Sequence, residues 1–289
     1  MIQANRLAPT NLSVCKMLWL RLAALVLIPK ISPTELKQPI AGDFDYDTHG
    51  QGYARQRRTD PRIAALVHQA LGPARVVLNV GAGAGSYEPA DRYVLAIEPS
   101  RAMRAQRPAH LSPAIDGVAE QLPLDDQSVD ASMALVTVHQ WRNLEKGLSE
   151  LRRVTRDRIV VLTFDGDALD RFWLADYAPE LMAVERGRYP AMDAICQGLG
   201  GKTEVQTVPI PIDCADGFTE AFYARPEQFL ESAVRRSQSA WGFVDEKIQE
   251  RFVKTLGDDL QSGAWNKKYG QWRTMPSFEG SLRLIIGHQ

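Results

Sequence analysis

The sequence contains few cysteines and has no excess of charge of either sign. Cys15, Cys196 and Cys214 lie far apart in the 289-residue chain and match no metal-ligand spacing. Such sparse cysteine is typical of a reducing compartment, so we expect a cytoplasmic protein without a disulfide framework and without a bound metal. The net charge of −1 provides no basic surface of the kind that general nucleic-acid binders use. This argues against nucleic acid as a partner.

Long hydrophobic runs are also missing. The apolar stretch near the N-terminus, residues 22–28, has seven residues, whereas a membrane-spanning helix needs about 20. No cleavage site of small residues follows it, because Pro29, Lys30 and Ile31 come next. We therefore expect neither a membrane span nor secretion, and we interpret residues 1–40 as an N-terminal extension.

The most informative segment, residues 76–86, reads VVLNVGAGAGS. Its apolar, Val-rich beginning is typical of a strand that is buried on both faces of a parallel sheet. The glycines that follow, Gly81, Gly83 and Gly85, let the backbone turn sharply and approach a ligand closely. In open α/β sheets, ligands bind beyond the carboxyl ends of the strands. The segment therefore predicts a nucleotide-like cofactor above this glycine loop.

Strands and helices alternate on both sides of the glycine loop. Apolar runs predict further strands at 94–97, 114–115, 131–138 and 159–164, and helical periodicity predicts helices at 61–71, 101–107 and 143–155. The last third adds strands at 204–210 and 282–286 between helical, aromatic-rich stretches at 191–199, 226–236 and 244–262. This alternation predicts an α/β protein with a doubly wound, mostly parallel sheet of seven strands.

Two features bear on which cofactor the loop binds. The NAD fingerprint G-x-G-x-x-G requires a third glycine where this chain has Ser86, and Pro89 in the short connection argues against a long helix that caps a pyrophosphate. Glu98, at the end of the next strand, can accept hydrogen bonds from both hydroxyls of a ribose. An NAD-dependent oxidoreductase therefore stays as the alternative, with the weaker support.

Four segments together resemble a known family. In this order and spacing, VVLNVGAGAGS, VLAIEPS, AEQLPLDDQSVDASMALVTVHQW and IVVLTF resemble the class I S-adenosylmethionine-dependent methyltransferases, most closely the bacterial type 11 group that acts on small molecules. The resemblance implies a Rossmann-like fold, S-adenosyl-L-methionine as cofactor and S-adenosyl-L-homocysteine as product. We accordingly expect residues 41–165 to form the cofactor-binding core with an N-terminal arm. Residues 166–289 would supply acceptor-binding insertions and the remaining strands of the same sheet.

The resemblance also implies which residues contact the cofactor. They are Asn79, Gly81, Ala82, Gly83 and Gly85 in the loop, Glu98 at the ribose, Pro99, Ser100 and Met103 beside the adenine, Ala119 and Glu120 near it, Val136 beneath the sulfonium, and Tyr53 and Arg58 from the arm. Two positions depart from the family. Asn79 stands where an acidic residue is common, and Val118 stands where Asp is frequent. An amide at position 79 cannot neutralise the amino group of the cofactor.

The reaction itself asks little of the protein. Transfer from a sulfonium depends on positioning the acceptor and excluding water. A base helps when the acceptor is a hydroxyl, and His139 at a strand end is the candidate, unless it only packs behind the sulfonium site. Trp141, Phe172 and Trp173 are expected to line the acceptor pocket. We therefore expect methyl transfer to an O, N or C atom of a small molecule; a non-catalytic cofactor-binding subunit is a second alternative. The acceptor and the oligomeric state are not predicted.

Overall fold

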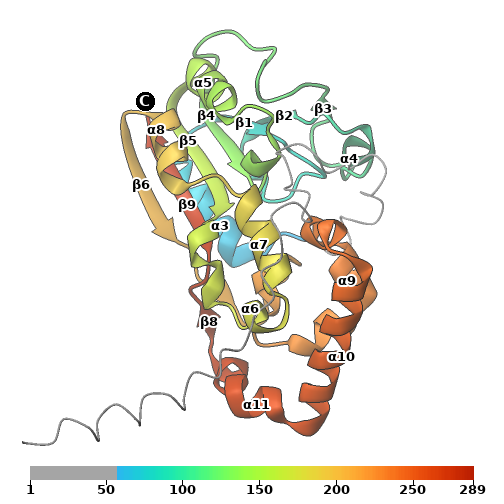
Figure 1. The fold of residues 1–289 in the computed structure, drawn as a ribbon. Coiled ribbons are helices and arrows are strands. Elements are labelled where there is room, and N and C mark those ends of the chain that lie inside the picture. Colours follow the sequence, from blue (N-terminus) through green and yellow to red (C-terminus); the bar gives the residue numbers. More distant parts are fainter. Residues whose placement is uncertain (1–56) are drawn as a thin grey trace, which may run out of the picture. The chain divides into compact units, whose positions relative to one another are not determined.

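The computed structural model describes residues 57–289, which belong to one compact unit; residues 1–40 and the predicted contact Tyr53 lie outside the described residues. Seven strands form one sheet in the order β3-β2-β1-β4-β5-β9-β6 (Figure 1). They are β1 (Val76–Val80), β2 (Tyr93–Ile97), β3 (Ala114–Ile115), β4 (Val129–Leu135), β5 (Thr155–Phe164), β6 (Lys202–Thr207) and β9 (Leu282–His288). The strands β1 to β5 pair in parallel, and β9 is antiparallel to β5 and β6. The predicted doubly wound, mostly parallel sheet is confirmed.

Helices cover both faces of this sheet. Because side chains alternate along a strand, Ile159 and Val161 of β5 pack in one core with α5 (Leu144–Val154) and α8 (Met192–Leu199). Val160 and Leu162, the residues between and after them, pack in the other core with α3 (Pro61–Ala70). In Figure 1, α5 and α8 lie side by side, and the two helices are in contact. Strand β5 is therefore buried from both sides, as its continuous apolar run requires.

Short polar side chains fix where the helices begin. The Asp60 carboxylate accepts a hydrogen bond from the backbone N–H of Arg62 at 3.0 Å, and Pro61 occupies the first position of α3. Ser100 caps α4 (Arg101–Ala105) by accepting from the N–H of Met103 at 3.2 Å. Both helix starts agree with the sequence. They place the chain that precedes β1 and the chain that follows β2 at fixed positions relative to the sheet.

No helix separates β1 from β2. The connection, residues 81–92, consists of turns, with positive φ at Gly81, Gly83 and Gly85 and at the non-glycine Tyr87. This agrees with the short, proline-containing segment in the sequence. The loop therefore lies at the carboxyl edge of the sheet without the helix that a dinucleotide-binding fold places there.

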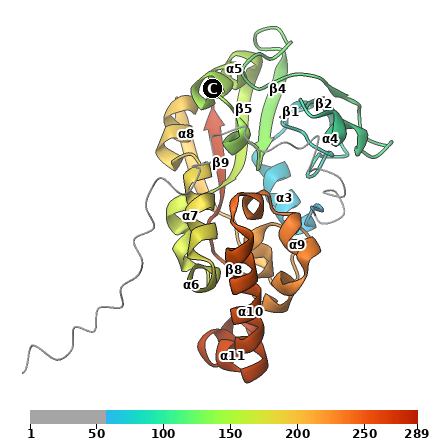
Figure 2. The same cartoon turned by 45° about the vertical axis from the view of Figure 1, so that its right-hand side comes forward.

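The last third is helical and adds a small two-stranded antiparallel sheet, β7 (Ile210–Pro211) with β8 (Ser277–Phe278). Its other helices are α6 (Leu174–Tyr177), α7 (Pro179–Arg188), α9 (Ser232–Arg236), α10 (Glu246–Ser262) and α11 (Ala264–Tyr269). Short 3₁₀ helices in this third span Gly166–Arg171, Thr219–Phe222, Pro226–Leu230, Ser239–Phe243 and Gly270–Thr274, and another, Val138–Gln140, follows β4. Figure 2 shows α10 and α11 toward the end of this unit opposite α5. Among residues 57–289, no helix has the length and apolarity needed to cross a membrane.

Two predicted elements of this third are divided in the structure. The strand expected at 204–210 ends at Thr207, and the chain then enters the separate strand β7 at Ile210. Pro209 stands between them and has no N–H to donate to a ladder. The helix expected at 226–236 is interrupted at Glu231, whose backbone is extended. The division leaves β6 in the large sheet and takes β7 out of it, and Ile210, Phe229 and Val234 are buried in the core that contains α3.

Candidate functional site

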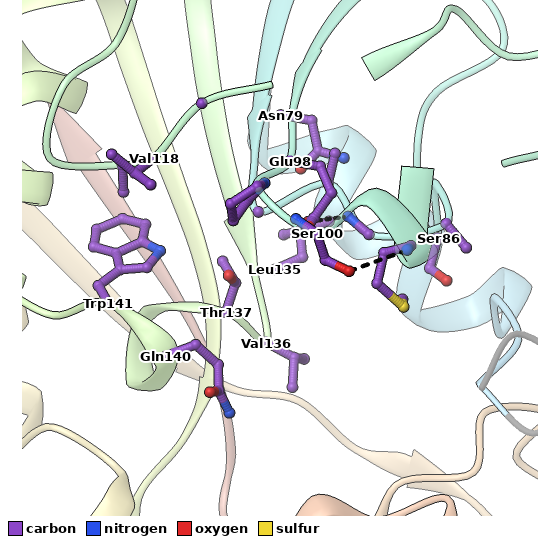
Figure 3. Close-up of a pocket in the computed structure, with 18 of the residues that line it drawn as sticks. Asn79, Ser86, Glu98, Ser100, Val118, Leu135, Val136, Thr137, Gln140 and Trp141 are labelled. Carbon is purple, nitrogen blue, oxygen red and sulfur yellow. Dashed lines mark hydrogen bonds between the residues drawn. The ribbon is translucent and has the colours of Figure 1, made fainter. Parts of the chain in front are cut away.

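A cavity of about 500 Å³ lies beyond the carboxyl ends of β1, β2 and β4. The predicted cofactor residues on its wall are Asn79, Gly81, Ala82, Gly83, Glu98, Pro99, Ser100, Met103, Ala119, Glu120 and Val136. Figure 3 shows Val118 and Trp141 on one side and Asn79, Glu98 and Ser100 on the other. Three strand ends thus bring together residues that are up to about sixty positions apart in the chain. We refer to this space as the large cavity.

Two predicted contacts do not lie on that wall. Gly85 donates its N–H to the carbonyl of Ala82 at 2.8 Å and so closes the turn of the loop. Arg58 is exposed, and its neighbour Arg57 lines the cavity instead. Arg57 is held by Asp216, whose carboxylate accepts from the guanidinium Nε at 2.6 Å. The structure therefore places Arg57, and not the predicted Arg58, on the wall of the cavity.

The glycine at the start of the loop is required by both its backbone and its neighbour. Gly81 has φ +69°, and its N–H donates to the carbonyl of Ile97 at 2.9 Å. A Cβ placed on it would collide with Oγ1 of Thr137, at the end of β4. The loop of β1 therefore packs directly against the segment that follows β4, and no side chain fits between them.

Replacement of Gly81 by alanine is expected to lower the free energy of unfolding by more than the ~1–2 kcal/mol that a positive φ costs an L-residue. The additional loss comes from the collision with Thr137. Gly263→Ala is the matched control, since Gly263 has φ +80° and nothing lies within 4 Å of the position that a Cβ would take there. Urea unfolding of both variants measures the difference. Equal losses would show that Thr137 does not restrict this position.

Glu98 is fixed by the backbone of the two loops that it joins. One carboxylate oxygen accepts from the N–H of Gly83 at 2.8 Å, and the other accepts from the N–H of Ser100 at 2.8 Å. Burial raises the pKa of the Glu98 carboxyl, and these two N–H groups partly offset the rise. Each oxygen keeps a second lone pair. The side chain can therefore accept two further hydrogen bonds from a pair of ligand hydroxyls.

Asn79 is oriented by a buried ion pair that the sequence did not reveal. Its Nδ2 donates to Glu88 at 2.9 Å, and the two oxygens of Glu88 accept from Arg107 at 3.0 and 2.9 Å. The Arg107 and Glu88 side chains are 4% and 1% exposed. Because a carboxylate cannot donate, the Asn79 amide must turn its nitrogen toward Glu88. Its buried Oδ1, which has no hydrogen-bond partner, is then available as an acceptor at the cavity.

A second, smaller cavity of about 40 Å³ lies behind Val136. Val136 and Arg57 line both cavities. Val136 has φ +53°, which is rare for a β-branched residue and costs about 1–3 kcal/mol. His139, expected as a base near the sulfonium, lies on the small cavity and not on the large one. Burial, reinforced by Arg188 and Arg57, lowers the pKa of its imidazole well below the usual value.

Polar side chains outnumber apolar ones on the wall of the small cavity. It is lined by Arg57, Val136, His139, Phe164, Leu169, Glu185, Tyr189, Phe218, Thr219, Glu220, Gln238, Ser239 and Ser281. The Glu220 carboxylate accepts from the backbone N–H and the hydroxyl of Ser281 at 2.9 and 2.7 Å. Burial nevertheless raises the pKa of Glu220 to about 7, and the nearby Glu185 adds to the rise while Arg283 opposes it. Glu220 is therefore a buried carboxyl that titrates near neutrality.

Glu220 is expected to make stability fall as pH rises. Its pKa is about 7 when folded, against an ordinary value of 4.5, so between these values the folded protein keeps a proton that the unfolded chain has released. Above pH 7 the free energy of unfolding is lower by at most about 3 kcal/mol than at pH values below 4.5. Urea unfolding at about pH 5 and about pH 8 measures it, and Glu220→Gln should remove most of this dependence. An unchanged slope in that variant would contradict the assignment.

The aromatic residues expected in an acceptor pocket lie in different places. Trp141 lines the large cavity, and its indole packs over Gly147 of α5. Phe172 and Trp173 are 1% and 2% exposed in the core that contains α3, and they line neither cavity, which corrects that prediction. Trp173 donates its indole N–H to the carbonyl of Tyr223 and contacts Trp265 edge-on. Both side chains stabilise the helical third.

Gln140 is a cavity residue that was not predicted from the sequence. Gln140 lines the large cavity, and its buried Nε2 has no hydrogen-bond partner. Together with Asn79 Oδ1 it offers one donor and one acceptor, which match the carboxylate and the ammonium of an amino acid moiety. Glu98 matches a ribose. Gln140 follows the predicted His139 directly, so its position at a strand end was the one available clue.

The comparisons with known proteins agree with this geometry. The family model described as "Methyltransferase domain" matches residues 78–161. A solved structure from Anabaena variabilis, described as a candidate methyltransferase from an antibiotic biosynthesis pathway, is 31% identical, with a TM-score of 0.75 over 81% of this chain and 99% of its own. A candidate histamine N-methyltransferase from Thermotoga maritima is 15% identical, with a TM-score of 0.50 over 84% and 97% of the two chains, and shares the fold. No curated protein sequence matches.

Proposed function

The chain belongs to the S-adenosylmethionine-dependent methyltransferases, and we propose that it transfers the methyl group to an O, N or C atom of a small molecule. Its cofactor is S-adenosyl-L-methionine, and S-adenosyl-L-homocysteine is the product. The observation that carries the proposal is the large cavity, whose polar groups match the parts of this cofactor one by one. The family assignment leaves the NAD-dependent alternative without support.

The residues of the large cavity support specific roles. Glu98 would accept hydrogen bonds from the two ribose hydroxyls, since both of its oxygens are held in place by backbone N–H groups. Asn79 Oδ1 would accept from the ammonium group of the methionine moiety. Gln140 Nε2 would donate to the carboxylate. The amide at position 79 thus offers an acceptor. The negative charge that the family commonly has at this position is instead on Glu88, to which Asn79 is hydrogen-bonded.

The bound cofactor supplies a methyl group that is already activated by the sulfonium. The protein must then orient the acceptor and exclude water. Val136 and Thr137 are suited to this because they form the wall at the end of β4, where Thr137 packs on Gly81. We further propose that residues 166–289 build the acceptor site, since Glu185, Tyr189, Phe218 and Gln238 of this segment line the cavity behind that wall.

A transfer assay tests the proposal. The protein is incubated with methyl-labelled S-adenosylmethionine and a panel of alcohols, phenols, amines and activated carbon acids, and the label is followed into the small-molecule fraction. We expect labelled product together with S-adenosylhomocysteine, and no product from Glu98→Ala. A protein that binds S-adenosylhomocysteine tightly but labels no member of the panel would instead be the non-catalytic binding subunit.

A further inference from the structure

We infer that the small cavity is a subsite for a neutral hydroxyl group of the methyl acceptor, held between Glu185 and Gln238. The inference rests on the proposed function and adds the chemical class of the acceptor. Three polar side chains on the wall carry it: His139, Glu185 and Gln238, which are 4%, 5% and 5% exposed. Each has a buried polar atom without a hydrogen-bond partner: Nδ1, Oε2 and Nε2. Such atoms are costly unless a ligand or water satisfies them.

The remaining bonds of these side chains fix which atom faces the cavity. Gln238 Oε1 accepts from the Trp241 indole N–H at 3.2 Å and lies 3.1 Å from the Thr219 hydroxyl, so the amide directs its NH₂ group elsewhere. Glu185 Oε1 lies 3.3 Å from the same hydroxyl, which leaves Oε2 as the open acceptor. The wall therefore presents the NH₂ group of Gln238 as a donor and Oε2 of Glu185 as an acceptor, with His139 Nδ1 as a third open atom. A hydroxyl group donates one hydrogen bond and accepts others, and it satisfies both.

The charges around the cavity argue for an uncharged ligand. Arg57 is paired with Asp216 at 2.6 Å, and Arg188 lies 3.9 Å from Glu185 Oε2 while donating to Ser239. Arg283 is paired with Asp165 at 3.1 Å, and Glu220, which titrates near neutrality, is bonded to Ser281. Positive and negative groups are thus balanced. An added ammonium or carboxylate would bring an unpaired charge into a buried space, whereas a hydroxyl would not.

Position and size also agree with a hydroxyl. Val136 and Arg57 line both cavities, so a group bound in the small one lies next to the cofactor site. The strained backbone of Val136 stands at this boundary, and such strain is concentrated at functional sites. A volume of about 40 Å³ is close to that of one water molecule, so the cavity admits a hydroxyl group and excludes an aromatic ring. His139, whose ring meets Tyr189 edge-on at 5.1 Å, acts here as a neutral hydrogen-bonding group.

Three two-carbon probes of different charge test the inference. Crystals of the protein grown with S-adenosylhomocysteine are soaked separately in ethanol, ethylammonium and acetate. We expect ethanol in the small cavity, with its oxygen within hydrogen-bond distance of Glu185 Oε2 and Gln238 Nε2, and neither ion. Ordered ethylammonium or acetate, or water alone in all three soaks, would overturn the inference.

Two variants distinguish recognition from chance occupancy. Gln238→Leu removes the donor and Glu185→Gln removes the charged acceptor, and both are expected to lose the ethanol. Ethanol bound equally well in either folded variant would be an adventitious additive only and would contradict the assignment. The same crystals report the proposed function independently, because S-adenosylhomocysteine occupies the large cavity or does not, whatever the small cavity holds.

Discussion

Replacement of Glu98 by glutamine is expected to weaken S-adenosylhomocysteine binding by about 100-fold, measured by isothermal titration calorimetry. The carboxylate accepts from the N–H groups of Gly83 and Ser100 and has two lone pairs left for the ribose hydroxyls. Glutamine has the same size as glutamate, but an NH₂ group replaces one of the oxygens. This donor then faces a backbone N–H and a ribose hydroxyl, which are donors themselves. The ribose then loses one hydrogen bond to a charged group, and its other bond goes to a neutral amide oxygen; together these changes cost about 3 kcal/mol, which corresponds to that factor.

The control for this variant is a carboxylate close to the same loop but outside the large cavity. Asp116→Asn removes an exposed ion pair with Arg104 at 3.1 Å and should leave the affinity unchanged. Thermal unfolding of both variants confirms that they fold. Equal affinities of Glu98→Gln and the unaltered protein for S-adenosylhomocysteine would show that Glu98 does not bind the ribose.

Removal of Arg107 alone is expected to destabilise the protein by about 3–5 kcal/mol, because Arg107→Met leaves the Glu88 carboxylate buried without its partner. Urea unfolding measures the loss. Replacing both partners, with Glu88→Leu added, should recover most of it, since an apolar pair leaves no uncompensated charge.

An exposed ion pair provides the comparison. Lys254 lies 2.5 Å from Asp258 on the surface of α10, and Lys254→Met should leave the free energy of unfolding nearly unchanged, since solvent screens this pair. If Arg107→Met costs no more than this control, the Glu88–Arg107 pair does not hold the loop, and Asn79 would need another explanation for its orientation.

Much of the sheet could be predicted because its strands are continuous apolar runs that end in turn residues. The run at 159–164 is buried on both faces, and the polar residues before it, such as Arg156, extend β5 toward the surface. The division of the segment 204–210 was not predicted. Hydrophobic pattern identifies extended chain there, but the change of partner from β9 to β8 depends on the tertiary structure.

The site was predictable where its residues stand at strand ends, since parallel strands deliver their carboxyl ends to one edge. Glu98 and Asn79 are of this kind. The ion pair of Glu88 with Arg107 was not predictable. Arg107 follows Arg101 and Arg104 at helical spacing, and this pattern is equally typical of a solvated helix face. Phe172 and Trp173 were misplaced for a related reason: an aromatic side chain has the same sequence signature in a core as in a pocket. Their neighbours in space decide which it is. The cytoplasmic location stays a prediction.

The most direct measurement is equilibrium binding of S-adenosylhomocysteine and of NAD(H) to the full-length protein. Isothermal titration calorimetry gives both affinities under one set of conditions. We expect saturable binding of S-adenosylhomocysteine, weakened in Glu98→Gln, and no binding of NAD(H). Tight binding of NAD(H) with none of S-adenosylhomocysteine would contradict the cofactor assignment.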